Sequence, residues 1–118
     1  MNSPTLDLSA VLERLDGDYD LFVTLAELFI RRCAGDLAAI QSAMQAGDFQ
    51  AMTSQAHKLK GSAMEFCAYP AVAAAKALEE QARSADMEQR EVLCRRVEVE
   101  VTRLSAELTA IIEKGFPS

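Results

Sequence analysis

The spacing of apolar residues is helical along most of the chain, and no segment alternates apolar and polar residues as a half-buried strand does. Apolar residues recur at steps of three and four, and Gly and Asp residues interrupt the pattern. It predicts five helices: Leu8–Leu15, one from an Asp18 cap to Ala46, Phe49–Phe66, one from Pro70 to Arg83, and one from an Asp86 cap to Lys114.

Residues that favour helix ends support these boundaries. Gly47 suits the left-handed position after a helix, and Asp48 suits the N-cap of the next one. Asp86 with Gln89 resembles a capping box, and Gly115 and Pro117 are expected to end the last helix. Four long amphipathic helices with short connections predict an all-α fold, an antiparallel up-down four-helix bundle with a short additional N-terminal helix.

Each long helix has one stripe of apolar side chains that we expect to face the core. In the second helix the stripe is Leu21, Leu25, Leu28, Phe29, Cys33, Leu37, Ile40 and Met44. In the third helix it is Phe49, Met52, Ala56, Leu59, Ala63 and Phe66. In the fourth helix it is Ala71, Ala74, Ala75, Leu78 and Ala82. In the fifth helix it is Leu93, Val97, Val101, Leu104, Leu108 and Ile111.

Composition narrows the class of protein. The 118 residues fit one domain spanning 1–118, and a 50% hydrophobic content supports a core. A formal net charge of −6 argues against nucleic-acid binding, which needs a basic surface. No apolar run is long enough for a membrane span, and Met1–Leu6 lacks the features of a signal peptide. The start at Met1 and the capped helices favour a free-standing protein.

The three cysteines are Cys33, Cys67 and Cys94, and their spacing matches neither a C-x-x-C pair nor a zinc site. An odd number of cysteines without a signal peptide indicates reduced thiols in the cytoplasm. We expect Cys33 and Cys94 to fill the core. A metal-binding bundle is disfavoured, because one histidine and no E-x-x-H pair cannot supply the ligands.

His57 is the only histidine, and it lies beside the apolar stripe of its helix. Thr53, His57, Lys60, Gly61 and Met64 share one face at steps of three and four. This face is polar and basic on an acidic protein. A neutral imidazole is a good nucleophile near pH 7, and a lysine one turn away could attract a phosphoryl group or steady its charge. The alternative is an inert surface histidine.

Gly61 is unusual, because glycine inside a helix costs about 1 kcal/mol relative to alanine. Nothing in the helix requires it. One explanation is that another molecule needs room beside His57. The alternative is that the helix simply tolerates the glycine.

The segment from His57 to Ala63, His-Lys-Leu-Lys-Gly-Ser-Ala, resembles the signature of histidine-containing phosphotransfer (HPt) domains. The flanks are also similar to that family: Leu15-Asp16-Gly17-Asp18 with Leu21, Glu27-Leu28-Phe29, Ala46-Gly47-Asp48, and Leu78-Glu79. The resemblance therefore covers nearly the whole chain.

The resemblance implies that His57 exchanges a phosphoryl group with an aspartate of response-regulator receiver domains. It also implies a hybrid sensor histidine kinase as a partner and a monomeric carrier. Such a carrier is not an enzyme and has no nucleotide site, and the sequence contains no Gly-rich phosphate loop. It needs no cofactor of its own, because the receiver supplies Mg²⁺ and most of the charge stabilisation. Together with His57, the resemblance and the spacing make Lys60, Gly61 and Glu79 the candidate site residues.

Two positions qualify the resemblance. Many members of the family have a Gly ten residues after the histidine, where this chain has Cys67, and a left-handed conformation there would strain a cysteine by about 1 kcal/mol or more. The family often has a Gln or Glu that holds the imidazole 22 residues after the histidine, and here that residue is Glu79. The alternative for Glu79 is an ordinary solvated helix residue.

Two other function classes stay open from the sequence alone. A histidine-kinase dimerisation helix pair or a phosphatase normally has an acidic residue directly after the histidine, where this chain has Lys58. Such a protein would also dimerise. A helical interaction module that is not phosphorylated is the other class, and an intact His57 argues against it.

Overall fold

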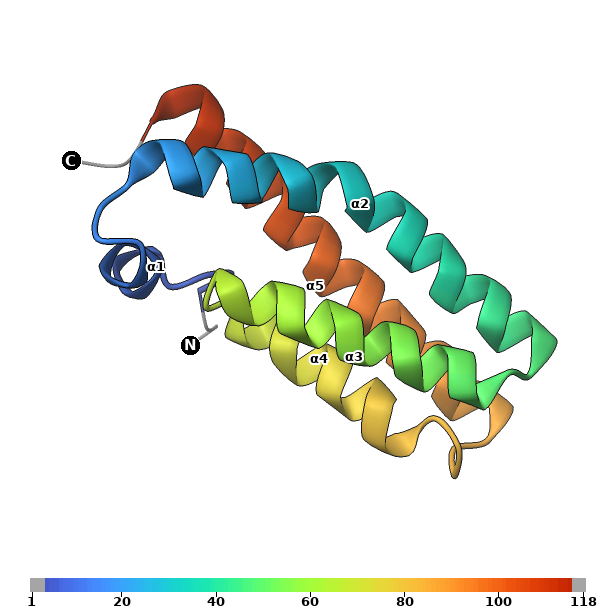
Figure 1. Ribbon diagram of the computed structural model, residues 1–118. Helices are drawn as coiled ribbons and strands as arrows, with labels where there is room; N and C mark the ends of the chain where they lie inside the picture. Colours follow the sequence, from blue (N-terminus) through green and yellow to red (C-terminus); the bar gives the residue numbers. More distant parts are fainter. Residues whose placement is uncertain (1–3, 116–118) are drawn as a thin grey trace.

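The computed structural model describes residues 4–115, and within that range it contains five α-helices and no strand. They are α1 (Leu8–Arg14), α2 (Tyr19–Ala46), α3 (Phe49–Glu65), α4 (Tyr69–Gln81) and α5 (Met87–Lys114) (Figure 1). The prediction of an all-α fold with a short first helix is confirmed, and the helix ends agree within about two residues. Pro117 and the first residues of the chain, Met1 to Ser3, lie outside the described residues.

The four long helices lie side by side (Figure 1). Helix α2 packs against α3 and α5, and α4 packs against the same two helices. Successive helices run in opposite directions along an elongated molecule of 46 × 30 × 20 Å. Helix α1 lies across one end, near the start of α2 and the last turns of α3. The middle of α3 therefore lies midway along the molecule.

Aspartate residues begin four of the five helices. Each side chain accepts a hydrogen bond from the backbone N–H three residues later, at 2.8–3.1 Å, which satisfies a donor that the first turn leaves unpaired. The four caps are Asp7, Asp18, Asp48 and Asp86. Gly47 ends α2 with a φ of +68°, a left-handed conformation that glycine adopts without strain. These caps explain why the sequence predicts the boundaries well.

The core side chains agree with the predicted stripes in α3, α4 and α5, apart from the half-buried Phe49 and Leu93. In α2 the prediction is partly wrong. Leu21 and Leu28 are 42% and 37% exposed, whereas Phe22 and Ala26 are fully buried. Both sets of residues have helical spacing, so periodicity alone could not choose between two adjacent stripes. Packing of Phe22 against the ring of Phe66, at 6.1 Å between centroids, helps fix the rotation of α2.

The connection between α3 and α4 is a tight turn through Cys67, whose φ is +50°. The N–H of Ala68 donates to the carbonyl of Ala63 at 3.1 Å, which is the hydrogen bond of a Schellman motif. The left-handed conformation considered for Cys67 is therefore present, at a cost of about 1 kcal/mol or more. The N–H of Asp7 donates to the Cys67 carbonyl at 3.1 Å, so the segment before α1 binds this turn.

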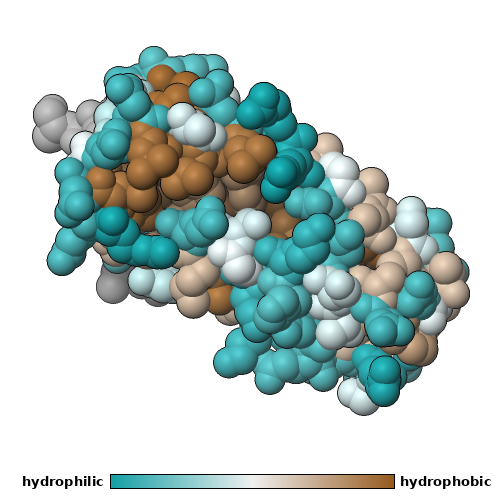
Figure 2. Space-filling model, in the orientation of Figure 1, coloured by the Kyte–Doolittle hydropathy of each residue, from teal (hydrophilic) through white to brown (hydrophobic). Residues whose placement is uncertain are grey.

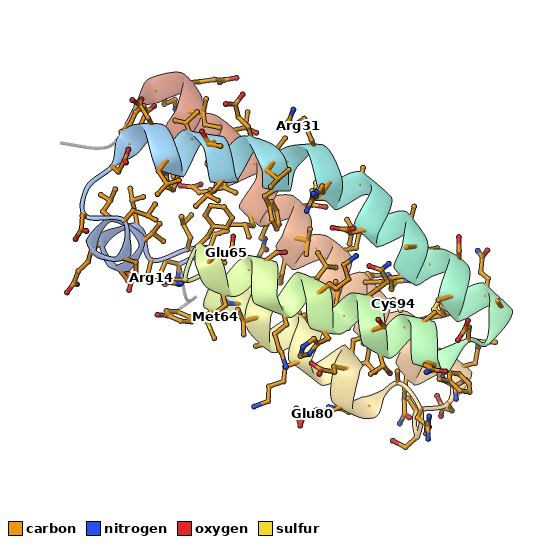
Figure 3. All side chains as sticks on the ribbon, viewed as in Figure 1. Arg14, Arg31, Met64, Glu65, Glu80 and Cys94 are labelled. Atoms are coloured by element: carbon orange, nitrogen blue, oxygen red, sulfur yellow. The ribbon has the colours of Figure 1, made fainter. Side chains whose placement is uncertain are left out.

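Helix α1 is also joined to the end of α3. The guanidinium of Arg14 donates to the carbonyl of Met64 at 2.9 Å, and the two residues lie side by side in Figure 3. The same carbonyl also accepts from the backbone N–H of Cys67 at 3.0 Å, so the Arg14 bond adds a side-chain donor to the turn that ends α3. The α1 segment therefore holds the end of the helix that bears His57.

Candidate functional site

Helix α3 has two contrasting faces. Met52, Ala56, Leu59 and Ala63 are buried in the core. The imidazole of His57, one position after the buried Ala56, is 68% exposed. The helix thus holds its backbone rigidly through one face while the other presents the only histidine to solvent.

Three of the predicted site residues are in contact. Oε1 of Glu79 on α4 lies 2.9 Å from Nδ1 of His57, and Oε2 of the same carboxylate lies 2.7 Å from Nζ of Lys60. Helices α3 and α4 pack closely, because the buried side of α4 consists largely of alanines. This close packing brings the Glu79 carboxylate, at 21% exposure, against α3.

The contacts keep the Glu79 carboxylate ionised. Its pKa lies below the ordinary value of 4.5, chiefly because Lys60 donates a hydrogen bond to it and then because His57 does, while partial burial acts in the opposite direction. An ionised carboxylate can only accept hydrogen bonds, so the proton of a neutral His57 ring sits on Nδ1. The lone pair of Nε2 is then available to a reacting partner.

The fourth predicted residue, Gly61, is exposed one turn after His57. A Cβ placed on it would meet no atom within 4 Å outside the local helix. Internal packing therefore does not require glycine at this position. The surface beside the imidazole is open, so a partner can approach closely there.

A groove of about 560 Å³ runs beside this site between α2 and α3. It combines apolar and charged side chains with the small residues Gly35 and Ser62. Its apolar lining consists of Leu25, Leu28, Phe29 and Phe66, its basic lining of Arg31, Arg32 and Lys58, and its acidic lining of Asp36 and Glu65. Figure 2 shows that a continuous apolar area extends over α1, the first half of α2 and the end of α3.

Comparisons with known proteins match both the sequence and the fold. The sequence model of the Hpt domain matches residues 24–113, a range that contains the histidine helix and Glu79. The chain belongs to the Hpt domain family. Hpt domains pass a phosphoryl group along a phosphorelay, so this chain functions in histidine phosphotransfer.

Two solved structures have the same fold as this Hpt domain. The histidine-containing phosphotransfer protein HptB from Pseudomonas aeruginosa PAO1 is 24% identical, with a TM-score of 0.85 over 98% of this chain and 100% of that one. The Hpt domain of a sensor hybrid histidine kinase from Shewanella is 20% identical, with a TM-score of 0.76 over 93% and 95% of the two chains. No curated protein matches the chain.

The described part of this Hpt domain shows no other obvious chemical site. Among residues 4–115, no group of His, Cys, Asp and Glu side chains is arranged to hold a metal ion. In the same range no helix is long and apolar enough to cross a membrane. Of the cysteines, Cys67 and Cys94 are buried and Cys33 is half-buried.

Sequence reasoning missed two features of the site. It treated Lys60 as a cation that faces an incoming phosphoryl group, whereas the structure pairs it with Glu79. It also missed the α2–α3 groove, because it assigned the exposed Leu28 to the core. The signal was present in the sequence: α2 carries more apolar residues than one buried stripe can hold.

Proposed function

We propose that His57 is the phosphoacceptor of this Hpt domain and that it exchanges the phosphoryl group with the aspartate of response-regulator receiver domains. The observation that carries the proposal is the contact between His57 Nδ1 and Glu79 at 2.9 Å on an exposed face. His57 is also the only histidine in the chain, so no other residue of that type can serve.

In the transfer step the lone pair of Nε2 attacks phosphorus in line with the aspartyl oxygen. The N–P bond forms as the bond between phosphorus and the aspartyl oxygen breaks, and the receiver's carboxylate leaves with the electron pair. The proton on Nδ1 stays on the ring, which becomes positively charged, and the Glu79 carboxylate stabilises that charge. The reverse step returns the phosphoryl group to a receiver.

Lys60 contributes through Glu79. Its ammonium binds Oε2 at 2.7 Å, which leaves Oε1 directed at the imidazole. The carboxylate is thus fixed at both oxygens, and the ring rotation that would bury or misdirect Nε2 is opposed. Lys60 also reduces the negative charge that an incoming phosphoryl group meets at Glu79.

The proposal extends to partners and surroundings. The α2–α3 groove offers a docking surface of apolar side chains with three basic and two acidic residues, and the excess of positive charge suits a receiver whose active site is acidic. The receiver supplies Mg²⁺, and this chain acts as a monomeric carrier without a nucleotide site, in the cytoplasm. Helices α2–α5 serve as an antiparallel up-down four-helix bundle that holds the site, within a single domain spanning 1–118. A hybrid sensor histidine kinase begins the relay.

Phosphotransfer from a receiver tests the proposal. A panel of receivers is phosphorylated with a labelled small acyl phosphate and mixed with the wild type or with His57→Gln. The loss of label from each receiver is then measured. We expect acid-labile label on the wild type only. Labelling of folded His57→Gln, or no labelling of the wild type by any receiver of the source cell, would contradict the proposal.

A further inference from the structure

Exposed apolar side chains gather at the end of the bundle where α1 lies. Residues 4–115 contain seven large apolar side chains that are exposed, and four of them lie at this end: Leu21, Leu28, Met64 and Tyr69. Leu28 lines the α2–α3 groove, whereas Met64 and Tyr69 do not. These last two side chains are 46% and 50% exposed, so the fold itself leaves them uncovered.

Both residues lie close to the phosphotransfer site. Met64 follows His57 by seven residues, which places it on the same face of α3 at a distance of about 10 Å along the helix. Tyr69 begins α4, the helix that carries Glu79, directly after the short turn that joins it to α3. The two side chains therefore lie where the helices that form the His57–Glu79 contact meet.

A receiver that docks over His57 has to cover Met64. A transient signalling interface buries up to about 600 Å² on each partner, which corresponds to a disc with a radius of about 14 Å. Centred on His57, such a disc includes Met64. In the opposite direction along α3 the exposed residues are polar, Gln50 and Ser54. Because covering apolar surface is favourable, the footprint should extend toward Met64 and Tyr69 rather than toward Gln50.

The two side chains suit the role of interface anchors, because Tyr and Met are enriched where proteins bind each other. The hydroxyl of Tyr69 forms a hydrogen bond with Cys67, which is the main reason that its pKa lies above the ordinary value of 10.0. The Tyr69 ring is thus held at the turn before a partner arrives. Met64 has a fixed backbone, since its carbonyl accepts from Arg14 at 2.9 Å, and an unbranched side chain that adapts to the surface covering it.

The chemistry at His57 does not distinguish one receiver from another. Each receiver has to bring a phosphoaspartate, Mg²⁺ and an acidic pocket to the imidazole. Discrimination between partners requires contacts that differ in free energy from one receiver to the next, so these contacts lie outside the reacting centre. Met64 and Tyr69 meet both conditions, since they lie at or near the footprint of the receiver and away from the transferred group.

We propose that Met64 and Tyr69 bind an apolar surface of the receiver beside its acidic pocket and thereby select among receivers. This inference rests on the proposed phosphotransfer function. A receiver with apolar side chains at that place covers both residues and gains their burial. A receiver with charged side chains there would have to desolvate them against Met64 and Tyr69, so it binds more weakly.

Single-turnover transfer from the receiver that serves the wild type best tests the proposal. Met64→Ala with Tyr69→Ala should raise the half-saturating concentration of the chain at least about tenfold, while the maximal rate stays within about twofold. Met64→Ala alone should raise that concentration about threefold. Across a panel of receivers, the double variant should narrow the spread of transfer efficiencies, because it removes the contacts that discriminate between them.

Two matched controls accompany the double variant. Gln50→Ala changes an exposed residue seven positions before His57, as Met64 lies seven positions after it, and should leave the half-saturating concentration unchanged. Tyr69→Phe keeps the ring and should also transfer normally. Circular-dichroism melts and phosphorylation of His57 by phosphoramidate, in which Nε2 attacks phosphorus, the P–N bond breaks and ammonia leaves, show that fold and site are intact without a receiver.

The outcomes separate this inference from the proposed function. A wild type that accepts the group from no receiver would contradict both. If the wild type accepts it normally, an unchanged half-saturating concentration in the double variant would overturn this inference alone. So would a loss confined to the maximal rate, an equal loss in Gln50→Ala, or dimerisation of the chain that the double variant abolishes.

Discussion

The two faces of α3 differ in their burial and in the contacts that they make. The inner face, with Met52, Ala56, Leu59 and Ala63, has almost no exposed surface and belongs to the apolar core. The outer face, with His57 and Gly61, is open to solvent, and its polar contact reaches across to Glu79 of α4. The same seventeen-residue helix thus combines a rigid support with an accessible reactive group.

Because the two faces differ in this way, stability and phosphotransfer can be changed separately in this helix. Residues of the inner face stabilise the fold because their apolar area is removed from water. Part of that stability is lost whenever a buried methyl or methylene group is deleted. Residues of the outer face contribute through position and charge relative to a partner that is absent from the free protein. Substitutions on one face should leave the property governed by the other nearly unchanged.

The largest expected effect is at Gly61. Gly61→Gln places a long side chain one turn from His57, where the partner's aspartate must bring phosphorus within roughly 3–3.5 Å of Nε2. Phosphotransfer should be blocked, while Gly61→Ala should be tolerated. Both variants should melt at or above the wild-type temperature, since each replaces a poor helix former in open space. The free energy of unfolding should rise by about 0.5–1 kcal/mol. Normal transfer by Gly61→Gln would show that the open surface has no docking role.

The inner face should show the reverse behaviour. Leu59→Ala removes a side chain that is 2% exposed and should lower the free energy of unfolding by about 2–5 kcal/mol. Lys58→Ala, one residue away on the exposed side, should change it by about 0.5 kcal/mol at most. Urea melts measure both. The rate of phosphotransfer per folded molecule should be unchanged in Leu59→Ala. A loss of transfer in a fully folded sample would show that the two faces are not independent.

Glu79, on α4, contacts His57 on the outer face of α3 and should affect the rate of transfer more than the binding of the receiver. Glu79→Ala frees the imidazole to rotate and removes the acceptor for the Nδ1 proton, so single-turnover transfer should slow by about tenfold. Glu79→Gln keeps an acceptor oxygen but no charge, so its rate should lie between those of Glu79→Ala and the wild type. The receiver's dissociation constant should stay constant across the three proteins. A transfer rate for Glu79→Ala equal to that of the wild type would show that Glu79 does not orient the imidazole.

The smallest expected effect is the pH dependence of the Lys60–Glu79 pair. The pKa of Glu79 is lowered in the folded protein, so its contribution to stability is full above its ordinary value of 4.5 and is lost as the pH falls through the folded pKa. The stability difference between the wild type and Lys60→Ala should therefore be present at pH 6 and shrink in acid. Urea melts over that range measure it. A difference that is independent of pH would mean that Lys60 acts through its alkyl chain.

Much of this molecule could be predicted from the sequence, because local rules govern it. Asp caps and Gly47 mark the helix ends, and the alanines of α4 identify a closely packed helix. The rotation of α2 was not predictable, since Leu21 and Phe22 begin two stripes of equal periodicity and only packing against Phe66 distinguishes them.

The site residues also differ in how far the sequence alone could predict them. The exposed position of His57 follows from helical periodicity. Glu79 lies on another helix, so no spacing rule within α3 could find it, and only the resemblance to a family indicated it. The bond from Lys60 to Glu79 depends on the distance between α3 and α4, which the sequence does not specify.

We infer that Glu79 directs the phosphoryl group to Nε2 of His57. The most direct measurement is two-dimensional ¹H–¹⁵N and ³¹P nuclear magnetic resonance of the protein, labelled with ¹⁵N and phosphorylated by a receiver. The coupling of phosphorus to a ring nitrogen identifies the nitrogen that carries the group. We expect a single phosphohistidine, bonded through Nε2, with Nδ1 still protonated. Phosphorus bonded to Nδ1, or to any residue other than His57, would contradict it.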